Sequence, residues 1–132
     1  MFVNRFLAGF MACAAMAGCA PPEPIAQKSF EPIKQACAGR DGWSDPAPPA
    51  HVFANVYMVG TCGITALLIT TAEGHFLIDG VVPQSAPQIT ANIAALGYKI
   101  SDVKFLLNSH AHIDHAGGLA GARRGQALAR PT

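Results

Sequence analysis

The sequence is that of one small domain and not of a disordered or nucleic-acid-binding chain. Its 132 residues are few for more than one domain, and 51% of them are hydrophobic whereas only 13% are charged, a balance that excludes disorder. The formal net charge of +1 provides no basic surface, so we expect no nucleic-acid partner.

Residues 1–20 have the plan of a secretory signal peptide. Arg5 is their only charge, an apolar run of roughly a dozen residues follows it, and small residues come next. The run is too short for a membrane span, which needs about 20 residues. The sequence around Cys19 also resembles the lipobox of bacterial lipoproteins, which would give a lipid anchor, whereas cleavage after Ala17 or Ala20 is the alternative. We therefore expect export to the periplasm.

Two cysteines remain in the exported part, Cys37 and Cys62. In an oxidising compartment two such cysteines tend to pair. Their disulfide would close a loop of about 25 residues and stabilise the fold by roughly 3 kcal/mol. Two free or buried thiols are the alternative.

Residues 21–51 are rich in Pro, Ala, Gly and polar residues and show no sustained period. We predict an irregular arm that carries Trp43. A β-rich run at 56–59 is the first predicted strand. Apolar runs at 64–71 and 75–79, joined by a short glycine-containing turn, are typical of a β-hairpin.

A helix is predicted next, beginning near Ser85. Ser85 and Gln88 fit a capping box, and Gly97 follows as the C-cap. One apolar stripe joins the two ends; it consists of Ile89, Ile93 and Leu96. Residues 103–107 are then a strand, and a strand–helix–strand unit implies a parallel pair with the helix across one face. The predicted fold class is therefore α/β, a mixed β-sheet with helices.

Three histidines and an aspartate lie within six positions directly after this last strand: His110, His112, Asp114 and His115. Open α/β sheets build their sites where strands end. In an extended chain, residues two apart point the same way at ~6.6 Å, so His110 and His112 can approach one metal ion, and imidazoles suit Zn²⁺. Asp114 and His115 can face a second ion, and the two glycines that follow allow a tight turn. A polar loop without metal is the alternative.

The run HAHIDH resembles the HxHxDH signature of the metallo-β-lactamase superfamily. Within that family, residues 37–118 are similar to subclass B3, through matches at 41–46, 57–63 and 77–80. His115 is unlike subclass B1, which usually has Arg there. The resemblance implies that this chain is half of the family's four-layer αβ/βα sandwich.

The resemblance also implies zinc-dependent hydrolysis of the β-lactam amide bond, and hence antibiotic resistance. His110 and His112 would bind the first of two zinc ions, and Asp114 and His115 would bind the second. Water activated by the metals would attack the β-lactam carbonyl, with Asp114 as the catalytic residue that orients it. The expected partner is a small-molecule β-lactam, with no protein partner implied.

Two further assignments follow from the same resemblance. Cys37 and Cys62 match a disulfide of some B3 members. Asp79, at the end of its strand, either supports the metal ligands or is a turn residue that caps the hairpin.

The sequence also departs from the family. Members are much longer and supply further histidines from the part that this chain lacks, whereas a closed first site needs three protein ligands and a water. His51 and His75 precede the signature, and we interpret both as exposed strand-edge histidines. Residues 52–120 are taken as the N-terminal half of the domain. Residues 121–132 are basic and lack an apolar stripe, so they are interpreted as the aberrant tail of a truncated or frameshifted product.

Such a chain would expose an apolar sheet face, and we expect poor solubility and impaired catalysis. Two other functions remain open. One is another hydrolase of the superfamily, acting on thioesters or lactones; the other is a non-catalytic exported fragment. The segment around Trp43 and the export signal favour the β-lactamase.

Overall fold

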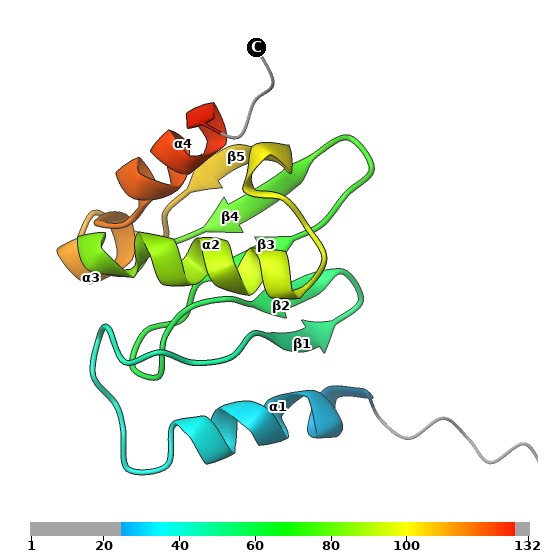
Figure 1. Cartoon of the computed structure of the whole chain (residues 1–132), viewed down its shortest axis with the longest axis vertical. Helices are drawn as coiled ribbons and strands as arrows, with labels where there is room; N and C mark the ends of the chain where they lie inside the picture. Colours follow the sequence, from blue (N-terminus) through cyan, green and yellow to red (C-terminus); the bar gives the residue numbers. More distant parts are fainter. Residues whose placement is uncertain (1–24, 129–132) are drawn as a thin grey trace, which may run out of the picture.

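The structure, a computed structural model that describes residues 25–128, is built on one mixed five-stranded sheet (Figure 1). The strands lie side by side in chain order. They are β1 (Ala50–Phe53), β2 (Val56–Met58), β3 (Leu67–Ile69), β4 (His75–Ile78) and β5 (Val103–Leu107). Pairing is antiparallel from β1 to β4 and parallel between β4 and β5. The predicted α/β class, the hairpin and the parallel pair are thus confirmed, whereas β1 was not predicted as a separate strand.

The helices lie on one face of this sheet and at its edges. They are α1 (Ile25–Ala36), α2 (Ala86–Ala95), α3 (Ile113–Ala116) and α4 (Leu119–Leu128), with short 3-10 turns η1 (Pro83–Ser85) and η2 (Ile100–Asp102). Helix α2 crosses one face, α4 lies near β5, and α1 runs outside β1 (Figure 1). Within residues 25–128, no helix combines the length and apolarity that crossing a membrane requires.

The core lies between the sheet and α2. Strand register places one apolar row on this face, Tyr57, Leu68, Leu77 and Leu106. Ile89 and Ile93 of α2 pack onto this row and are completely buried, as the predicted stripe requires. This packing holds β4 and β5 firmly beneath α2, and their ends carry the residues discussed below.

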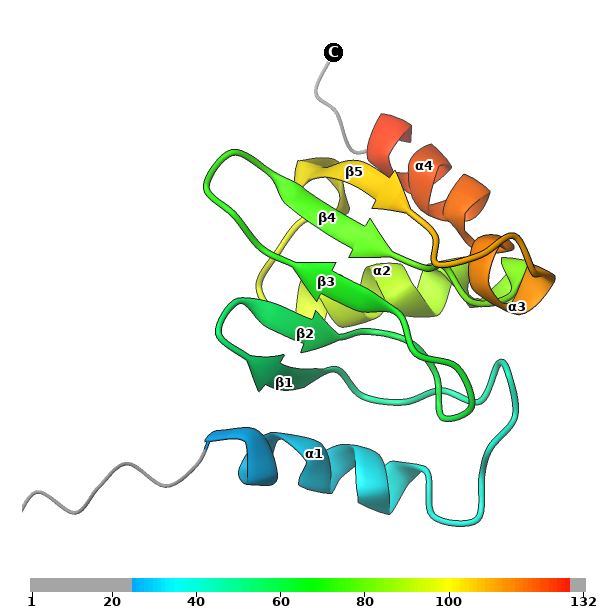
Figure 2. The ribbon, with the colours of Figure 1, turned by 180° about the vertical axis from the view of Figure 1, so that it is seen from behind.

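The opposite face of the sheet is apolar and carries no helix of the described residues (Figure 2). Because side chains alternate along a strand, register gives it two rows: Val56, Ile69, Phe76 and Phe105; and Met58, Leu67, Ile78 and Leu107. Phe105 and Leu107 are 49% and 48% exposed, and the Phe105 ring stacks on Phe76 at 4.4 Å. The predicted exposed apolar face is therefore present.

The two ends of α2 differ in how well the sequence predicted them. Gly97, with φ of 86°, donates its N–H to Ala94, and Tyr98 donates to Ile93, which is the Schellman C-cap expected of this glycine. The prediction of a capping box at Ser85 is wrong. The turn η1 runs directly into α2, so Ser85 has helical dihedrals and makes no side-chain cap.

Two amides of α2 instead anchor the helix to distant backbone. Gln88 Nε2 donates to the carbonyl of Ala47 at 3.3 Å, and buried Asn92 Nδ2 donates to Ala47 and Val59, each at 3.0 Å. Buried polar groups need such partners. These bonds fix α2 to the loop before β1 and to the end of β2.

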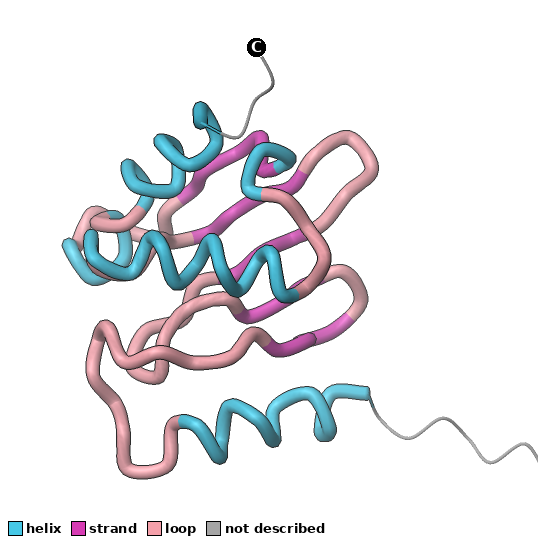
Figure 3. The backbone as a smooth tube through the Cα atoms, viewed as in Figure 1, coloured by secondary structure: helices cyan, strands magenta, loops and turns pink. Residues whose placement is uncertain are grey.

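The arm at 21–51 is not irregular throughout, because it contains α1. Pro32 lies inside this helix, and since proline disfavours helix interiors, the sequence obscured the element. Glu31 and Lys34 form an i,i+3 ion pair at 2.7 Å along it. The remainder up to β1 is loop (Figure 3). The predicted signal peptide, with Cys19, and residues 129–132 lie outside the described residues.

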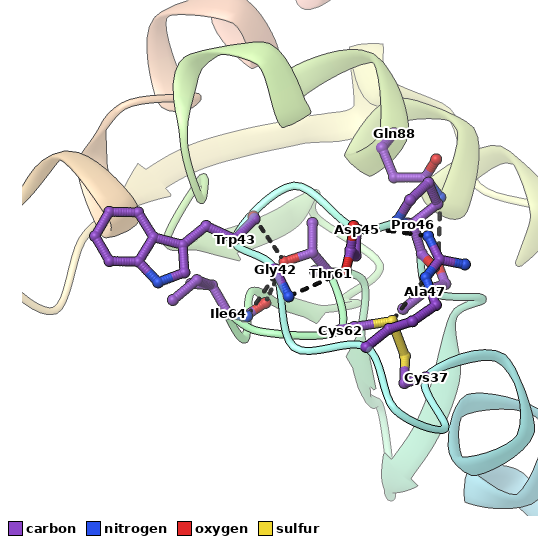
Figure 4. Close-up of a disulfide and its surroundings, with 12 residues drawn as sticks. Cys37, Gly42, Trp43, Asp45, Pro46, Ala47, Thr61, Cys62, Ile64 and Gln88 are labelled. Atoms are coloured by element: carbon purple, nitrogen blue, oxygen red, sulfur yellow. Dashed lines mark hydrogen bonds and ion pairs between the residues drawn. A yellow bond between two sulfur atoms is a disulfide. The ribbon is translucent and has the colours of Figure 1, made fainter.

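A disulfide between Cys37 and Cys62 joins α1 to the turn after β2 (Figure 4). Thr61 Oγ1 donates to the carbonyl of Trp43 at 3.0 Å, and Pro46 forms an isolated bridge with Thr61. The cystine pairing predicted from the sequence is thus confirmed. It holds the segment around Trp43 against the turn at 60–63, so two of the three stretches that resembled subclass B3 are neighbours in space.

Removing this disulfide should destabilise the chain. For the double variant Cys37→Ala/Cys62→Ala we expect the free energy of unfolding to fall by about 3 kcal/mol, because the unfolded chain regains the entropy of a closed loop. Urea unfolding followed by circular dichroism measures this. A reductant should cause a similar loss in the parent protein and none in the variant; equal midpoints for parent and variant would contradict the prediction.

The tail predicted as aberrant is helical as far as the structure describes it. Helix α4 runs to Leu128, Ala122 on it is completely buried, and Gln126 donates to the carbonyl of Val103 at 2.9 Å. A Cβ on Gly121 would collide with that of Ala86. Small residues thus let α4 approach α2 closely, so the helix packs without the apolar stripe that a helix was expected to need.

Candidate metal centre

The candidate site lies where β4 and β5 end. Because these strands are parallel, their carboxyl ends share one edge of the sheet, and α3 lies beside that edge (Figure 2). Asp79 follows β4, and its N–H donates to the carbonyl of Leu107 at 2.9 Å. Ser109 and His110 follow β5. Residues distant in sequence therefore meet through strand pairing alone.

The remaining residues of the signature lie in the short helix α3 or directly before it. His112 is extended, with φ of −68° and ψ of 151°, and α3 begins after it. Its carbonyl accepts the N–H groups of His115 at 3.1 Å and Ala116 at 2.9 Å. Asp114 and His115 consequently lie in the first helical turn, which turns both side chains back toward the end of β5.

The four predicted site residues come together. One ligand atom each from His110, His112 and Asp114 lies within 4.8 Å of the other two. The ring centroid of His110 is 4.6 Å from that of His112 and 4.1 Å from that of His115, and His115 Nε2 is 3.5 Å from Asp114 Oδ2. The sequence predicted two separate pairs, whereas the structure places Asp114 next to both.

Asp79 supports this cluster through contacts with His115 and Ser109. Its side chain is nearly buried, and Oδ2 lies 2.9 Å from His115 Nδ1. Oδ1 accepts the N–H of Ser109 at 2.7 Å, and Oδ2 also lies 2.9 Å from Ser109 Oγ. Of the two interpretations left open for Asp79, this geometry favours the first, because its carboxylate contacts His115, a member of the cluster.

These contacts keep Asp79 ionised. Burial by itself would raise the pKa of its carboxyl group, but the hydrogen bonds from His115 and Ser109 outweigh it and hold the pKa below the usual value. An ionised carboxylate can only accept hydrogen bonds. Hence the proton in the contact with His115 belongs to Nδ1, and Nε2 is the nitrogen that lies on the side of Asp114.

The backbone beneath the cluster adopts rare conformations. Asp79 and Val81 have positive φ values of 63° and 59°, which is unusual for a β-branched residue such as Val. Two backbone bonds hold the turn, Gly80 N–H to His115 O at 2.6 Å and Gly118 N–H to Val81 O at 3.0 Å. Such strain persists only where the surroundings fix it, and here the strained turn fixes the position of Asp79 relative to His115.

The donor set fits a zinc ion. Two imidazole nitrogens and a carboxylate oxygen are ligands that zinc takes at about 2.0–2.2 Å, and ligands at that distance from one ion are about 3–4 Å apart. The spread within 4.8 Å is close to this. His110 and His112 are exposed, whereas Asp114 and His115 are half-buried, so the cluster is open to small molecules on one side.

The other two histidines of the described chain do not join the cluster. His51 is half-buried and its Nε2 bonds to Ala54 O at 2.8 Å. His75 is buried, so its interpretation as an exposed strand-edge residue is wrong. Its ring meets Tyr98 edge-on at 5.0 Å, and its Nδ1 accepts the N–H of Thr71 at 3.2 Å. These partners explain why a histidine is tolerated in the core.

Ser109 was not predicted from the sequence as a site residue, although it directly precedes His110. A serine beside a histidine is common, and its role depends on Asp79, 30 residues away. The spacing of HAHIDH therefore revealed the ligands but not the residues that orient them.

Comparisons with known proteins agree with this geometry. A family model described as the metallo-beta-lactamase superfamily matches residues 59–126. The crystal structure of the metallo-β-lactamase MIM-1 from Novosphingobium pentaromativorans is 46% identical, with a TM-score of 0.69 over 72% of this chain and 36% of that one. The Rm3 metallo-β-lactamase is 53% identical over 64% of this chain and 32% of that one, with a TM-score of 0.62.

A third solved structure is BJP-1 from Bradyrhizobium japonicum, described as a subclass B3 metallo-β-lactamase. It is 44% identical, with a TM-score of 0.61 over 64% of this chain and 32% of that one. The chain thus spans about a third of the length of these relatives. The family match extends past Ala120 into α4, in agreement with the ordered packing of that helix. The chain belongs to the metallo-β-lactamase superfamily, and its predicted resemblance to subclass B3 is confirmed.

Proposed function

We propose that the cluster after β5 is part of the di-zinc centre of a β-lactam hydrolase. The observation that carries the proposal is the convergence of His110, His112 and Asp114 within 4.8 Å, beside a His115 whose Nδ1 is bonded to Asp79. A histidine held in this way by a carboxylate is typical of metal ligands. The three solved structures compared above are described as metallo-β-lactamases, which favours β-lactams as substrates.

His110 and His112 would hold the first zinc ion, and Asp114 and His115 would hold the second. Bound zinc would lower the pKa of water to about 7 and polarise the carbonyl group. The chain's own contribution is placement. Asp79 accepts the Nδ1 proton of His115, so that Nε2 would be the nitrogen that binds the metal. Asp114 presents a carboxylate next to the imidazoles, where it can accept a hydrogen bond from the attacking water and orient it. The exposed rings of His110 and His112 leave the approach of a substrate open.

The described residues do not complete this centre. A catalytic zinc site has three protein ligands and an open position, and only His110 and His112 serve the first ion here. Further ligands would have to come from outside residues 25–128. The activity proposed is accordingly that of the assembled centre. We expect the 132-residue chain to bind zinc but to show impaired hydrolysis.

We further propose that the protein is exported to the periplasm. The disulfide between Cys37 and Cys62 supports an oxidising compartment. Lipidation at Cys19 stays part of the proposal, and mass spectrometry of the protein from a membrane fraction would detect the added lipid.

Zinc titration of the chain tests the metal centre. We expect His112→Ala to weaken zinc binding, measured by competition with a chromophoric chelator, by more than the roughly 100-fold that loss of an outer partner can cost. His51→Gln serves as the matched control and should bind zinc as the parent does. Equal affinities for all three proteins would overturn the assignment.

A hydrolysis assay tests the substrate. A protein with the complete centre should hydrolyse a carbapenem, and a chelator should abolish the reaction. Hydrolysis of a thioester but of no β-lactam would assign the chain to another hydrolase of the superfamily. Zinc binding without either reaction would favour a non-catalytic role.

A further inference from the structure

Ser109 lies between Asp79 and the first histidine of the cluster. Its backbone N–H donates to Asp79 Oδ1 at 2.7 Å. Its hydroxyl oxygen is 2.9 Å from Asp79 Oδ2 and 3.0 Å from His110 Nδ1, and lies farther, at 3.4 Å, from His115 Nδ1. One hydroxyl group therefore bridges a nearly buried carboxylate and an exposed imidazole.

The position of the hydroxyl proton follows from counting donors and acceptors. Ser109 Oγ donates to Asp79 Oδ2 at 2.9 Å, and a serine hydroxyl has a single proton to give. If that proton pointed at His110, the oxygens of Ser109 and Asp79 would face each other at 2.9 Å with no proton between them, which is repulsive. The hydroxyl therefore donates to Asp79, and its lone pairs are left to accept.

We infer that Ser109 is a positioning residue that passes the orienting effect of Asp79 on to His110. Because the hydroxyl accepts from His110, the imidazole proton is held on Nδ1 and the lone pair on Nε2. The inference rests on the proposed function, in that Nε2 is taken to be the atom that faces a metal ion. One carboxylate then orients two histidines assigned to different ions, His115 directly and His110 through Ser109.

His112 provides an internal comparison for this inference. Within residues 25–128, its ring contacts the ring of His110 but has no hydrogen bond to a protein group. A change at Ser109 should therefore alter the proton position on His110 and leave those on His112 and His115 unaltered. General loosening of the loop would instead affect all three.

Nitrogen-15 NMR of the imidazoles in the metal-free protein tests the inference without depending on activity. At about pH 8, His110 of the parent should show the Nδ1–H form. In Ser109→Ala, we expect His110 to shift toward the Nε2–H form, with His112 and His115 unchanged. Ser109→Thr keeps a hydroxyl and should restore the parent pattern, and Ser44→Ala, at an exposed serine, should not alter it. Zinc affinity of the first site should fall by about 10–100-fold in Ser109→Ala, as for other outer partners of metal ligands.

The outcomes separate the inference from the proposed function. An unchanged His110 pattern in Ser109→Ala, or an Nε2–H form already present in the parent, overturns the inference even if zinc binds normally. A changed pattern in a protein that binds no zinc supports the role of Ser109 and overturns the metal centre. If Ser109→Thr behaves like Ser109→Ala, the hydroxyl is not responsible and the inference is wrong.

Discussion

Replacing Asp79 by asparagine is expected to lower the zinc affinity of the centre by about 10–100-fold, the range found when the outer partner of a metal-binding histidine is changed. The substitution keeps the size of the side chain. It also suits the positive φ of 63°, since asparagine tolerates the left-handed region as aspartate does. The effect would therefore arise from the proton positions and not from the backbone.

The physical reason is a reversal of the histidine tautomer. With an amide at position 79, the oxygen can still accept the N–H of Ser109, but the NH₂ group then faces His115 Nδ1, which must become an acceptor. The imidazole proton moves to Nε2, the nitrogen that lies 3.5 Å from Asp114, and a protonated nitrogen cannot bind a metal. An aspartate-to-asparagine change in the triad of a serine protease impairs the enzyme in the same way, by holding its histidine in the wrong tautomer.

The same variant has a pH signature in the metal-free chain. Although burial acts to raise the pKa of Asp79, His115 and Ser109 lower it in the folded state, so around and below the ordinary value of about 3.9 the unfolded chain binds more protons. This contribution to stability is complete above that value and is lost as the pH falls through the folded pKa. Urea unfolding between about pH 2 and 5 should show this loss in the parent and not in Asp79→Asn.

Asp102→Asn provides the matched control, because Asp102 is exposed and lies at the opposite end of β5. It should bind zinc as the parent does and keep the parent's acid profile. Zinc affinity of Asp79→Asn equal to that of the parent would show that Asp79 does not orient the ligands.

How far the sequence predicted this centre depends on the distance over which each interaction acts. HAHIDH was recognisable because its ligands are contiguous in the chain and follow a strand whose apolar pattern is local. The contact between Asp79 and His115 spans 36 positions and exists only because β4 and β5 pair in parallel. Sequence alone left Asp79 as either a supporting residue or a turn residue, since an aspartate after a strand is common in both roles.

The errors in the fold share a different cause. Residues 121–132 were interpreted as an aberrant tail because they lack an apolar stripe, and α4 instead packs through small residues, with Ala122 buried and Gly121 against Ala86. Histidines outside the signature were expected at the surface, yet His75 is buried against Tyr98. In each case a tertiary partner, which has no signature in the local pattern, determines where the residue lies.

Substituting Gly118 by alanine should destabilise the fold by about 3 kcal/mol or more, because overpacking at backbone contacts is costly. A Cβ there would collide with the carbonyl oxygen of Gly80, far inside the distance at which atoms can approach. The contact cannot widen easily. Gly118 N–H is bonded to Val81 and Gly80 N–H to His115, so separating the two segments breaks both bonds and moves a ligand.

Gly125→Ala, in the helix that follows Gly118, is the matched control with the opposite expected sign. Gly125 lies inside α4, and the nearest atom to an added Cβ is 3.6 Å away, on Ile100. Alanine should therefore stabilise the helix by about 0.5–1 kcal/mol. Urea unfolding gives both values, and zinc titration should show weakened binding for Gly118→Ala alone. Both variants add one methyl group to a glycine, so they differ only in where the methyl group lies. If Gly118→Ala is no less stable than Gly125→Ala, the turn after β4 does not pack tightly against the start of α4. The support proposed for His115 would then be lost as well.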